Sequence, residues 1–485
     1  ADHAAFRDSG LAHLLAVAGL HIGIVMGFTM AATRLALACS ERASLFWPAK
    51  RIAAVAALTA GGGYMVVTGM HVPIIRSFTM ACLFTLAVLV GRRPVSVRGL
   101  AVAAVVLMTI SPQEVPGVSF QMSFSAVLAL ISGYEALRPW LRRLHGKSLA
   151  RRFIAHVVAL ALTSALAGTA SAPYGAYHFG HVQLYFVLAN MIAVPLTAMW
   201  VMPAGLIALP LMPIGLDWLV LRPMGWGAEA IVWVARTTAS LPVATLDVPH
   251  IPAWGLAVLS LGIAWLGIWR TPIRLAGLIG IALGIASPAW EHQPDMLVSA
   301  DARLIAVRTD GGLFFEQAQG GSKFTRDAWV QYWAAGPPQP MPRAGTAADN
   351  AITCTATGCV LRPHIDGAAA LLVRGGARPE GGCREISIIV STEPARGLCP
   401  KPWPKLVDRF TVWRSGSAAI WLTHNGAFIL TDRQARGVRP WVPPPPEPRR
   451  RTAPELTLAP VNDRASYHSS RINNGGSARP TAPVP

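Results

Sequence analysis

Two histidines stand inside the first long apolar run of the chain, where an ionisable side chain is unusual. His13 and His21 are eight positions apart, roughly 80° around a helix, and Gly10, Gly19 and Gly23 flank them. An ionisable group at membrane depth is costly and normally faces the protein interior or a water-filled cavity. Two interpretations stay open: the imidazoles bond to neighbouring helices, or they line a polar passage.

A third polar side chain of this kind is Arg76, which lies a few residues inside an apolar segment and follows the glycine run 61–63. Its aliphatic stem could carry the charge to the membrane surface. Alternatively, the guanidinium could hold a passing phosphate, because its planar fork donates two parallel hydrogen bonds. The glycines would let helices approach closely in either case.

Aromatic and polar side chains alternate at the start of another apolar segment, at Phe120, Gln121, Ser123 and Phe124. The polar groups could form bonds between helices, each worth about 0.6 kcal/mol. They could also form a wet wall in which the two rings offer faces for stacked bases. Such stacking tolerates any sequence and suits a conduit for single strands.

A long apolar run over 184–212 is interrupted by prolines. Asn190 precedes Pro195 in this run, and we expect a structural role for both, with the amide satisfying backbone groups freed by the proline. His178 and His181 lie close together before it, but no carboxylate accompanies them. The sequence therefore predicts no metal site and no cofactor.

Membrane helices are the elements that must position these residues. The chain has 485 residues, of which 53% are hydrophobic and only 14% charged, and its mean hydropathy is +0.43. About 25% charged residues are usual in soluble proteins. Apolar runs long enough to span a bilayer recur. The sequence predicts a polytopic α-helical membrane protein of about 9–10 spans, at roughly 10–38, 52–70, 74–90, 99–111, 118–137, 153–173, 184–212, 217–240, 252–269 and 272–290.

Basic residues gather in alternate loops, which predicts their cytoplasmic side. They lie near Arg42 and Arg51, at 92–98, at 138–152 and at Arg270. Counting spans from there places the chain after about 290 outside the cytoplasm, in the periplasm of a Gram-negative cell. The net charge of +18 permits contact with nucleic acid or anionic lipid but proves neither.

The composition changes after the last apolar run. Residues 291–440 show short alternating runs separated by turns, which predicts a small β-rich soluble domain after a transmembrane domain over 1–290. Residues 441–485 are rich in Pro and Arg and should be disordered. In an oxidising compartment the four cysteines of the β-rich part, Cys354, Cys359, Cys383 and Cys399, would form two disulfides with one of three connectivities.

Four stretches, in order over about residues 10–200, resemble motifs of the ComEC competence-channel family. The first is the run from Gly10 to Gly23, with Ala18 where the family has Ser. The others are 61–76, 118–130 with Ser119 in place of Gly, and 190–195. The OB-like and metallo-β-lactamase-like domains of many family members are not evident, so we expect a fragment lacking an N-terminal portion.

The resemblance implies an inner-membrane channel that takes single-stranded DNA into the cytoplasm during natural transformation. Its partners would be single-stranded DNA, the lipid bilayer, a DNA receptor and a cytoplasmic motor ATPase. The path or gate residues would be His13, His21, Arg76, Phe120, Gln121, Ser123 and Phe124.

No HxHxDH, GxxxxGK[ST], GxSxG or HExxH motif occurs in the chain, so we expect no catalytic residues and no enzyme activity. Three rivals to the channel remain. A proton-coupled or anion secondary transporter would also use broken helices and intramembrane histidines. A metal-dependent membrane hydrolase would use the histidines, and a degenerate family member would have lost transport.

Overall fold

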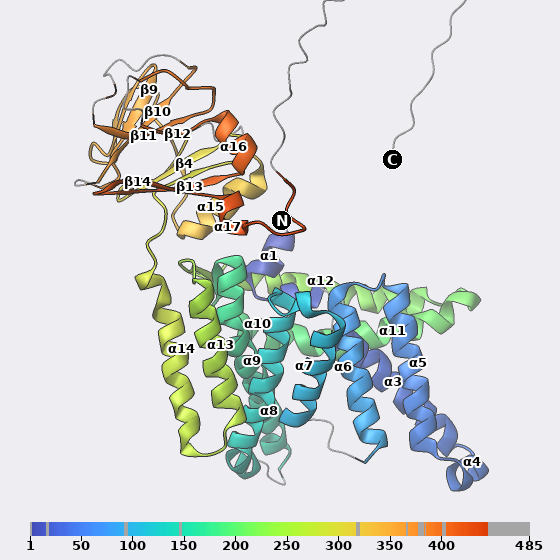
Figure 1. The fold of residues 1–485 in the computed structure, drawn as a ribbon. Coiled ribbons are helices and arrows are strands. Elements are labelled where there is room, and N and C mark those ends of the chain that lie inside the picture. The colour runs from blue at the N-terminus through green and yellow to red at the C-terminus, as the bar shows by residue number, and fades with distance from the viewer. Residues whose placement is uncertain are drawn as a thin grey trace, which may run out of the picture.

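The computed structural model describes residues 2–15, 19–91, 96–144, 148–316, 321–364, 367–376, 383, 385–399 and 404–444. It shows a helical bundle with a strand-rich domain at one end (Figure 1). The predicted class, a helical membrane protein with a β-rich C-terminal part, is confirmed. Most of the predicted disordered tail, and Ala18, lie outside the described residues.

Every apolar run predicted from the sequence contains a helix. The α-helices are α1 (Asp2–Asp8), α2 (Ala12–Leu15), α3 (Gly19–Ala38), α4 (Glu41–Phe46), α5 (Ala49–Val67), α6 (Val72–Leu89), α7 (Val97–Ile110), α8 (Val118–Leu144), α9 (Leu149–Phe179), α10 (Phe186–Leu196), α11 (Met202–Leu211), α12 (Trp218–Ala239), α13 (Ala253–Ile268) and α14 (Gly277–Ala286). Short 3-10 or π segments are η1 (Pro112–Glu114), η2 (Thr197–Val201), η3 (Met212–Ile214), η4 (Pro272–Ala276) and η5 (Ser287–Trp290).

Five segments of the described chain are long and apolar enough to cross a membrane: Gly19–Ala38, Val118–Leu144, Leu149–Phe179, Phe186–Ile214 and Pro272–Trp290. Three further apolar helices, Pro73–Leu89, Val97–Ile110 and Ala253–Ile268, are shorter. The number of long apolar helices is thus smaller than the 9–10 predicted spans.

The basic loops and the strand-rich domain lie at opposite ends of the bundle. Helices α5 to α9, α13 and α14 run up and down between these ends, and α3 is tilted (Figure 1). The helix ends that flank the connections through α4, from α6 to α7, from α8 to α9 and from α13 to α14 all lie at the end away from the strands. These are the connections in which the sequence concentrates Lys and Arg.

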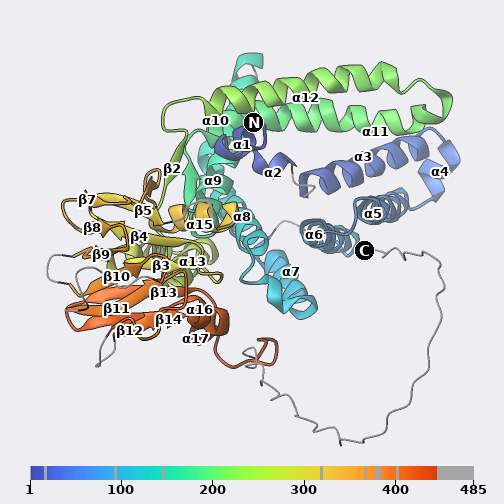
Figure 2. The ribbon, with the colours of Figure 1, turned by 90° about the horizontal axis from the view of Figure 1, so that it is seen from above.

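Helices α11 and α12 differ from the others in direction. Seen from above, they lie lengthwise side by side, whereas α5 and α6 are seen nearly end-on (Figure 2). The pair therefore lies across the bundle, although Phe186–Ile214, which includes α11, is long and apolar enough for the span predicted over 184–212. Pro195 and the π segment η2 interrupt the helix before the crossing, and such interruptions are the usual causes of a kink.

The N-terminal segment is held against this crossing pair. Phe6 of α1 and Leu11 are buried with residues of α10 and α12 in one apolar cluster. Asp2 also accepts hydrogen bonds from Arg236 of α12 at 2.6 and 2.8 Å. The first predicted motif therefore begins at a well-packed position.

Helices α13 and α14 form a glycine seam, which we define by Gly255, Gly262, Gly277 and Gly284. A Cβ atom on Gly262 would lie 2.7 Å from the carbonyl oxygen of Gly277. One on Gly284 would lie 2.7 Å from the carbonyl oxygen of Gly255. The two backbones therefore pack closer than any side chain would allow.

Two six-stranded sheets form the C-terminal domain. The first has the order β14-β13-β3-β4-β5-β6 and the second β12-β11-β10-β9-β8-β7. β5 pairs with β6, β10 with β11, and β11 with β12 in parallel; the other pairs of these two sheets are antiparallel. The strands are β3 (Met296–Val298), β4 (Ile305–Thr309), β5 (Gly312–Glu316), β6 (Gln339–Pro340), β7 (Gly345–Ala347), β8 (Ile352–Thr355), β9 (Gly358–Leu361), β10 (Ala369–Val373), β11 (Ile386–Ser391), β12 (Lys405–Val407), β13 (Ala418–Thr423) and β14 (Gly426–Thr431).

The main core of this domain lies between the sheets. Ile305 and Val307 of β4 share one buried cluster with Leu372 of β10 and Ile388 of β11. Because alternate side chains of a strand point to opposite faces, Ala306 lies in a second cluster with Trp333 of helix α15 (Lys323–Trp333). The domain thus buries both faces of its first sheet.

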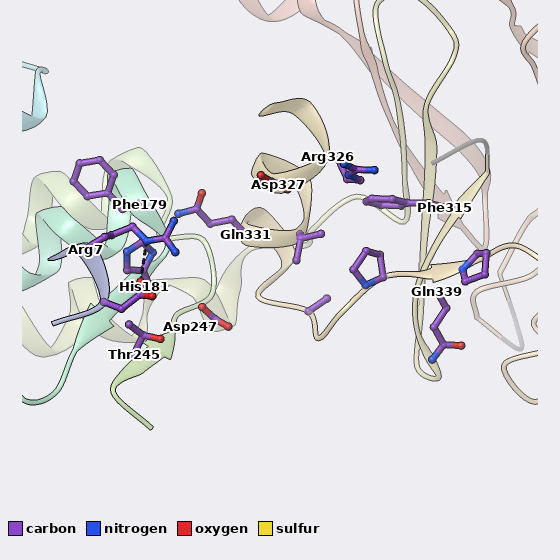
Figure 3. Close-up of a pocket in the computed structure, with 15 residues that line it drawn as sticks. Arg7, Phe179, His181, Thr245, Asp247, Phe315, Arg326, Asp327, Gln331 and Gln339 are labelled. Atoms are coloured by element: carbon purple, nitrogen blue, oxygen red, sulfur yellow. Dashed lines mark hydrogen bonds and ion pairs between the residues drawn. The ribbon is translucent and has the colours of Figure 1, made fainter. Parts of the chain in front are cut away.

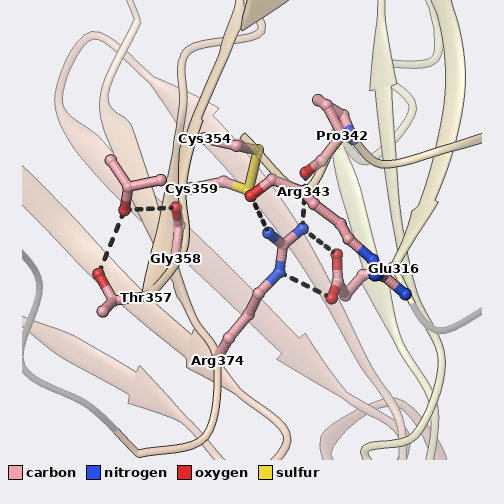
Figure 4. Close-up of a disulfide and its surroundings, with 9 residues drawn as sticks. Glu316, Pro342, Arg343, Cys354, Thr357, Gly358, Cys359 and Arg374 are labelled. Atoms are coloured by element: carbon pink, nitrogen blue, oxygen red, sulfur yellow. Dashed lines mark hydrogen bonds and ion pairs between the residues drawn. A yellow bond between two sulfur atoms is a disulfide. The ribbon is translucent and has the colours of Figure 1, made fainter. Parts of the chain in front are cut away.

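Two disulfides join the cysteines of the second sheet and its loops. Cys354 of β8 pairs with Cys359 of β9, and Cys383 pairs with Cys399. The first bridge lies beside the side chain of Arg374 (Figure 4). Among the described cysteines, Cys39 and Cys82 of the helical part are free.

Candidate functional site

Three of the helices that carry predicted polar residues meet at the end that faces the C-terminal domain. Arg76 is the fifth residue of α6 and Gln121 the fourth of α8, and both helices begin at that end (Figure 1). His178 is the last but one residue of α9, which ends there. The helix directions therefore place these side chains at one level of the bundle.

Arg76 connects α6 to α8. Its side chain is buried, with 8% of its surface exposed, and its Nη1 donates a hydrogen bond to the Ser119 hydroxyl of α8. Glu114 of η1 is the carboxylate whose field acts on the guanidinium. Among the ion pairs between described residues, none includes Arg76. A buried cation without an ion-pair partner is costly, so Arg76 is a candidate functional residue.

Phe120, Gln121 and Phe124 line a cavity of about 400 Å³ between α7, α8, α9 and α13. The two rings stack with centroids 4.2 Å apart. Gln121 Oε1 lies 2.9 Å from His178 Nε2, which can donate a hydrogen bond to it. Ser123, one position further along α8 than Met122, is half-buried. The structure thus presents an aromatic pair beside a polar amide–imidazole pair.

The two histidines of the first motif lie elsewhere. His21 lines a separate cavity of about 380 Å³ with Phe6 and residues of α12. His13 is exposed on α2, and its Nδ1 lies 3.1 Å from the carbonyl oxygen of Gly10. The predicted wall residues therefore do not share one cavity, because Phe120, Gln121 and Phe124 line one and His21 lines another.

The glycines of the first motif and Asn190 of the last motif differ in their surroundings. A Cβ on Gly19 would make an ordinary contact of 3.6 Å with Ser77, and one on Gly23 would meet no atom within 4 Å. Asn190 is buried, yet its Oδ1 has no hydrogen-bond partner among the described atoms. A carbonyl freed at Pro195 needs a donor, which the amide nitrogen of Asn190 and not this oxygen could supply, so the structural role expected of Asn190 stays a prediction.

A chain of ring contacts links the cavity at α8 to the C-terminal domain. The ring of His250, between α12 and α13, lies 5.9 Å from that of Tyr177 and 4.8 Å from that of Tyr332 on α15. Tyr177 in turn contacts His178, the partner of Gln121. We call Tyr177, His250 and Tyr332 the ring junction.

Burial shifts the pKa values of His250 and Tyr332 in the ring junction. Burial lowers the pKa of His250, and the nearby carboxylate of Glu291 acts in the opposite direction. Burial, helped by Glu291 and opposed by Arg308, raises the pKa of Tyr332 to about 12. Glu291 Oε2 is itself buried without a partner among the described atoms. The neutral forms of both rings are therefore favoured where the two domains meet.

A cleft of about 780 Å³ lies beside this junction, between the helical part and the C-terminal domain. His181 and Asp247 lie on one side of it, and Arg326, Asp327 and Gln331 on the other (Figure 3). Its remaining charged residues, Arg7 and Asp8, form an ion pair with each other. Three aspartates against two arginines make this cleft unsuited to a polyanion. Within the described ranges, no group of three or more metal-binding side chains is present.

Sequence reasoning missed the partners of the predicted residues. Ser119 stood out only as a departure from a family motif, yet it accepts the Arg76 bond. His178 was considered only for a metal site, whereas it pairs with Gln121. Nothing in the local sequence at His250 signals its contact with Tyr332, because the two residues belong to different domains.

Comparison with known proteins adds the following. A family model described as Competence protein matches residues 1–272. A curated relative, ComE operon protein 3 of Bacillus subtilis (strain 168), is 25% identical over 254 residues, which is 51% of this chain and 29% of that protein. The chain therefore covers less than a third of that relative's length. No solved structure matches the chain.

Proposed function

Because this chain belongs to the competence protein family, we propose that its helices form a membrane passage for incoming single-stranded DNA. The family, which four motifs indicated in the sequence, is confirmed. The passage itself is an inference from the placement of polar and aromatic side chains at one end of the bundle.

The observation that carries the proposal is the buried guanidinium of Arg76. A strand of DNA brings one negative charge per nucleotide, which apolar surroundings would oppose strongly. Arg76 offers a cation that is held by a hydroxyl rather than neutralised by a carboxylate at contact distance. Phe120 and Phe124, one and five residues after Ser119 on α8, add stacking faces that tolerate any base.

We place the basic loops in the cytoplasm of a bacterial inner membrane and the C-terminal domain outside. The separation of these loops from the strand-rich domain supports this orientation, as does the presence of two disulfides in the outer domain. The proposal assigns no chemical step to the chain. A DNA receptor and a cytoplasmic motor would deliver and pull the strand.

The test is replacement of Arg76 in a transformable host that depends on this chain for uptake. Loss of a hydrogen bond to a charged group costs about 1.5–3 kcal/mol, so Arg76→Ala should lower uptake of labelled DNA about tenfold or more. Arg76→Lys should recover part of it, because a charge remains. Arg51→Ala, at the opposite end of the bundle, is the control.

Membrane levels of all variants must match by immunoblot. If Arg76→Ala takes up DNA as well as the parent at equal levels, Arg76 does not contact the strand and the proposal loses its main support.

The second candidate is a secondary transporter for a small anion or a proton-coupled solute. The π segment η2, the interior Pro195 and the unpartnered oxygen of buried Asn190 favour it, since interrupted helices form solute sites in such proteins. If the chain is such a transporter, Asn190→Ala should abolish solute uptake and leave DNA uptake unchanged. If it is a DNA passage, Arg76→Ala should lower DNA uptake and leave solute uptake unchanged.

A further inference from the structure

Helix α16 (Arg409–Ser415) presents large aromatic rings to solvent. Phe410 is 53% exposed and Trp413 is 51% exposed, while Val412 on the opposite face is buried in the main core. Arg409 and Arg414 are also exposed, and the pairs Arg409 with Trp413 and Phe410 with Arg414 are each four residues apart, which makes them neighbours on the helix surface. The outward face of α16 thus consists of two arginines and two rings.

The neighbouring helix α17 (Asp432–Arg436) and the segment after it extend this face. Arg433 Nε donates a 3.2 Å hydrogen bond to the carbonyl oxygen of Arg414, which brings α17 against the end of α16. Arg433 Nη2 also donates to the carbonyl oxygen of Pro443 at 3.1 Å. This second bond holds the segment that carries Trp441, which is 74% exposed. We call Arg409, Phe410, Trp413, Arg414, Arg433 and Trp441 the arginine–aromatic surface.

The surface has little negative charge of its own. Asp408 is buried and accepts a hydrogen bond from the backbone of Thr411, so it caps α16. Asp432 is paired with Arg436 at 2.8 Å. In the described part of the chain, no ion pair includes an arginine of the surface. Its positive charge is therefore available to a partner.

Arginines interleaved with exposed rings are the chemistry of a single-strand binding platform. The guanidinium groups attract phosphates, and each ring offers a face on which a base can stack. In Figure 1, α17 lies at the edge of the C-terminal domain nearest the helical bundle, and α16 adjoins it. The surface therefore stands outside the membrane helices but close to them.

We propose that the arginine–aromatic surface binds single-stranded nucleic acid without sequence preference. A duplex is a poorer ligand, because its bases are already stacked on one another and cannot reach the rings. The alternative partner is an anionic membrane surface, which carries negative charge as nucleic acid does. The proposal goes beyond the passage in the membrane, and its test measures binding rather than transport.

The experiment uses the full chain in detergent and a labelled oligonucleotide of about 20 nucleotides, longer than a typical single-strand site. Fluorescence anisotropy measures the dissociation constant at several salt concentrations. The double variant Phe410→Ala, Trp413→Ala should bind about tenfold more weakly, and duplex DNA should bind more weakly than the single strand. Arg409→Gln with Arg414→Gln should reduce the slope of log affinity against log salt by about 0.7 for each lost phosphate contact.

Two matched controls test whether any exposed ring or any exposed arginine of the domain would bind the oligonucleotide equally well. Phe428 is 56% exposed on β14, and Arg303 is exposed before β4. Phe428→Ala and Arg303→Gln should leave binding unchanged. The C-terminal domain of every variant should resist limited proteolysis as the parent does, which verifies that the domain has folded.

Two results would overturn the proposal. One is equal binding by the surface variants and the controls. The other is unchanged DNA binding together with a loss of binding to vesicles containing anionic lipid, which would assign the surface to the membrane. Failure of the passage is measured by DNA uptake in Arg76→Ala, and failure of this surface is measured by oligonucleotide binding in Phe410→Ala, Trp413→Ala, so the two failures are distinguishable.

Discussion

At the scale of single residues, the ion pair of Arg374 with Glu316 connects the two sheets of the C-terminal domain. Arg374 donates two parallel bonds to the carboxylate, at 2.9 and 2.7 Å, and further bonds to two backbone carbonyls (Figure 4). Its side chain is only 19% exposed and that of Glu316 only 11%. Removing one partner would leave the other charge poorly solvated.

We therefore expect Arg374→Met to destabilise the domain by about 3 kcal/mol. The double variant Arg374→Met, Glu316→Leu should recover most of this loss, because no unpaired charge remains. Pulse proteolysis of the full chain over a urea series measures the difference. A double variant no more stable than the single one would mean that the carbonyl contacts of Arg374, rather than its charge pair, hold the sheets.

A pH dependence follows from the ring junction. Burial lowers the pKa of His250, so the imidazole binds a proton more readily when the domains separate than when they are in contact. Contact is therefore fully stable above about pH 6.5 and weakens as the pH falls below it, by at most tenfold per pH unit. Glu291, which favours the charged imidazole, moderates the effect.

Limited proteolysis of the connection between the domains at pH 7.5 and pH 5.5 measures this opening. His250→Gln should remove the acid-dependent part of the cleavage rate, and Tyr332→Phe, which keeps the ring contact, should preserve it. An equal response to acid in His250→Gln would assign the pH dependence to other groups.

The sequence could identify Arg76 and Gln121 because a polar side chain stands out in an apolar run. It could not identify Ser119 or His178 as their partners. Those contacts depend on how α6, α8 and α9 pack, at sequence separations of 43 and 57 residues. The prediction that all polar wall residues share one passage is not what the structure shows, since His21 lines its own cavity.

At the scale of elements, the glycine seam depends on the absence of side chains. We expect Gly262→Ala to force α13 and α14 apart, because its methyl group would lie 2.7 Å from two backbone atoms. The midpoint of heat-induced aggregation in detergent should fall by several degrees.

Gly63→Ala in α5 is the control, since a Cβ there meets no atom within 4 Å. Alanine restricts the unfolded backbone and should raise or preserve the midpoint. If both substitutions lower the midpoint equally, close approach of the backbones is not what holds the pair together.

Hydrophobic runs predicted where helices lie, because a membrane segment needs a long apolar stretch. They could not predict direction: α11 and α12, in the runs 184–212 and 217–240, lie across the bundle, although Phe186–Ile214 is long and apolar enough for the predicted span. Composition alone does not distinguish a helix that spans from one that lies across its neighbours. The alternating runs of the β-rich part did predict strands, notably β4, β10, β11 and β13.

At the scale of the whole molecule, α1 and the C-terminal domain lie at the same end of the bundle (Figure 1). In the proposed orientation, a phosphatase that folds only outside the cytoplasm should be active when fused after Pro444. It should be inactive when fused after Leu144, at the end of α8. Activity assays in intact cells compare the two fusions at equal expression, and the reverse pattern would invert the orientation.

The distribution of Lys and Arg was enough to predict which helix connections lie on the same side of the bundle, because loop charge sets membrane orientation. The seating of the C-terminal domain was not predictable. It depends on contacts such as that of Gly180, where a Cβ would lie 2.3 Å from Gln331 of α15. No local pattern in the sequence encodes a contact between residues this far apart.

Helices that touch backbone to backbone cannot slide or bend independently, so α13 and α14 act as one stiff support. The chain leaves this support after Trp290 and enters β3 at Met296. Any swivelling of the outer domain must therefore take place within the few peptide units between them, which include Glu291 and Pro294. The position of the whole domain over the bundle thus depends on a joint about five residues long together with the contacts of α15 with Gly180 and His250.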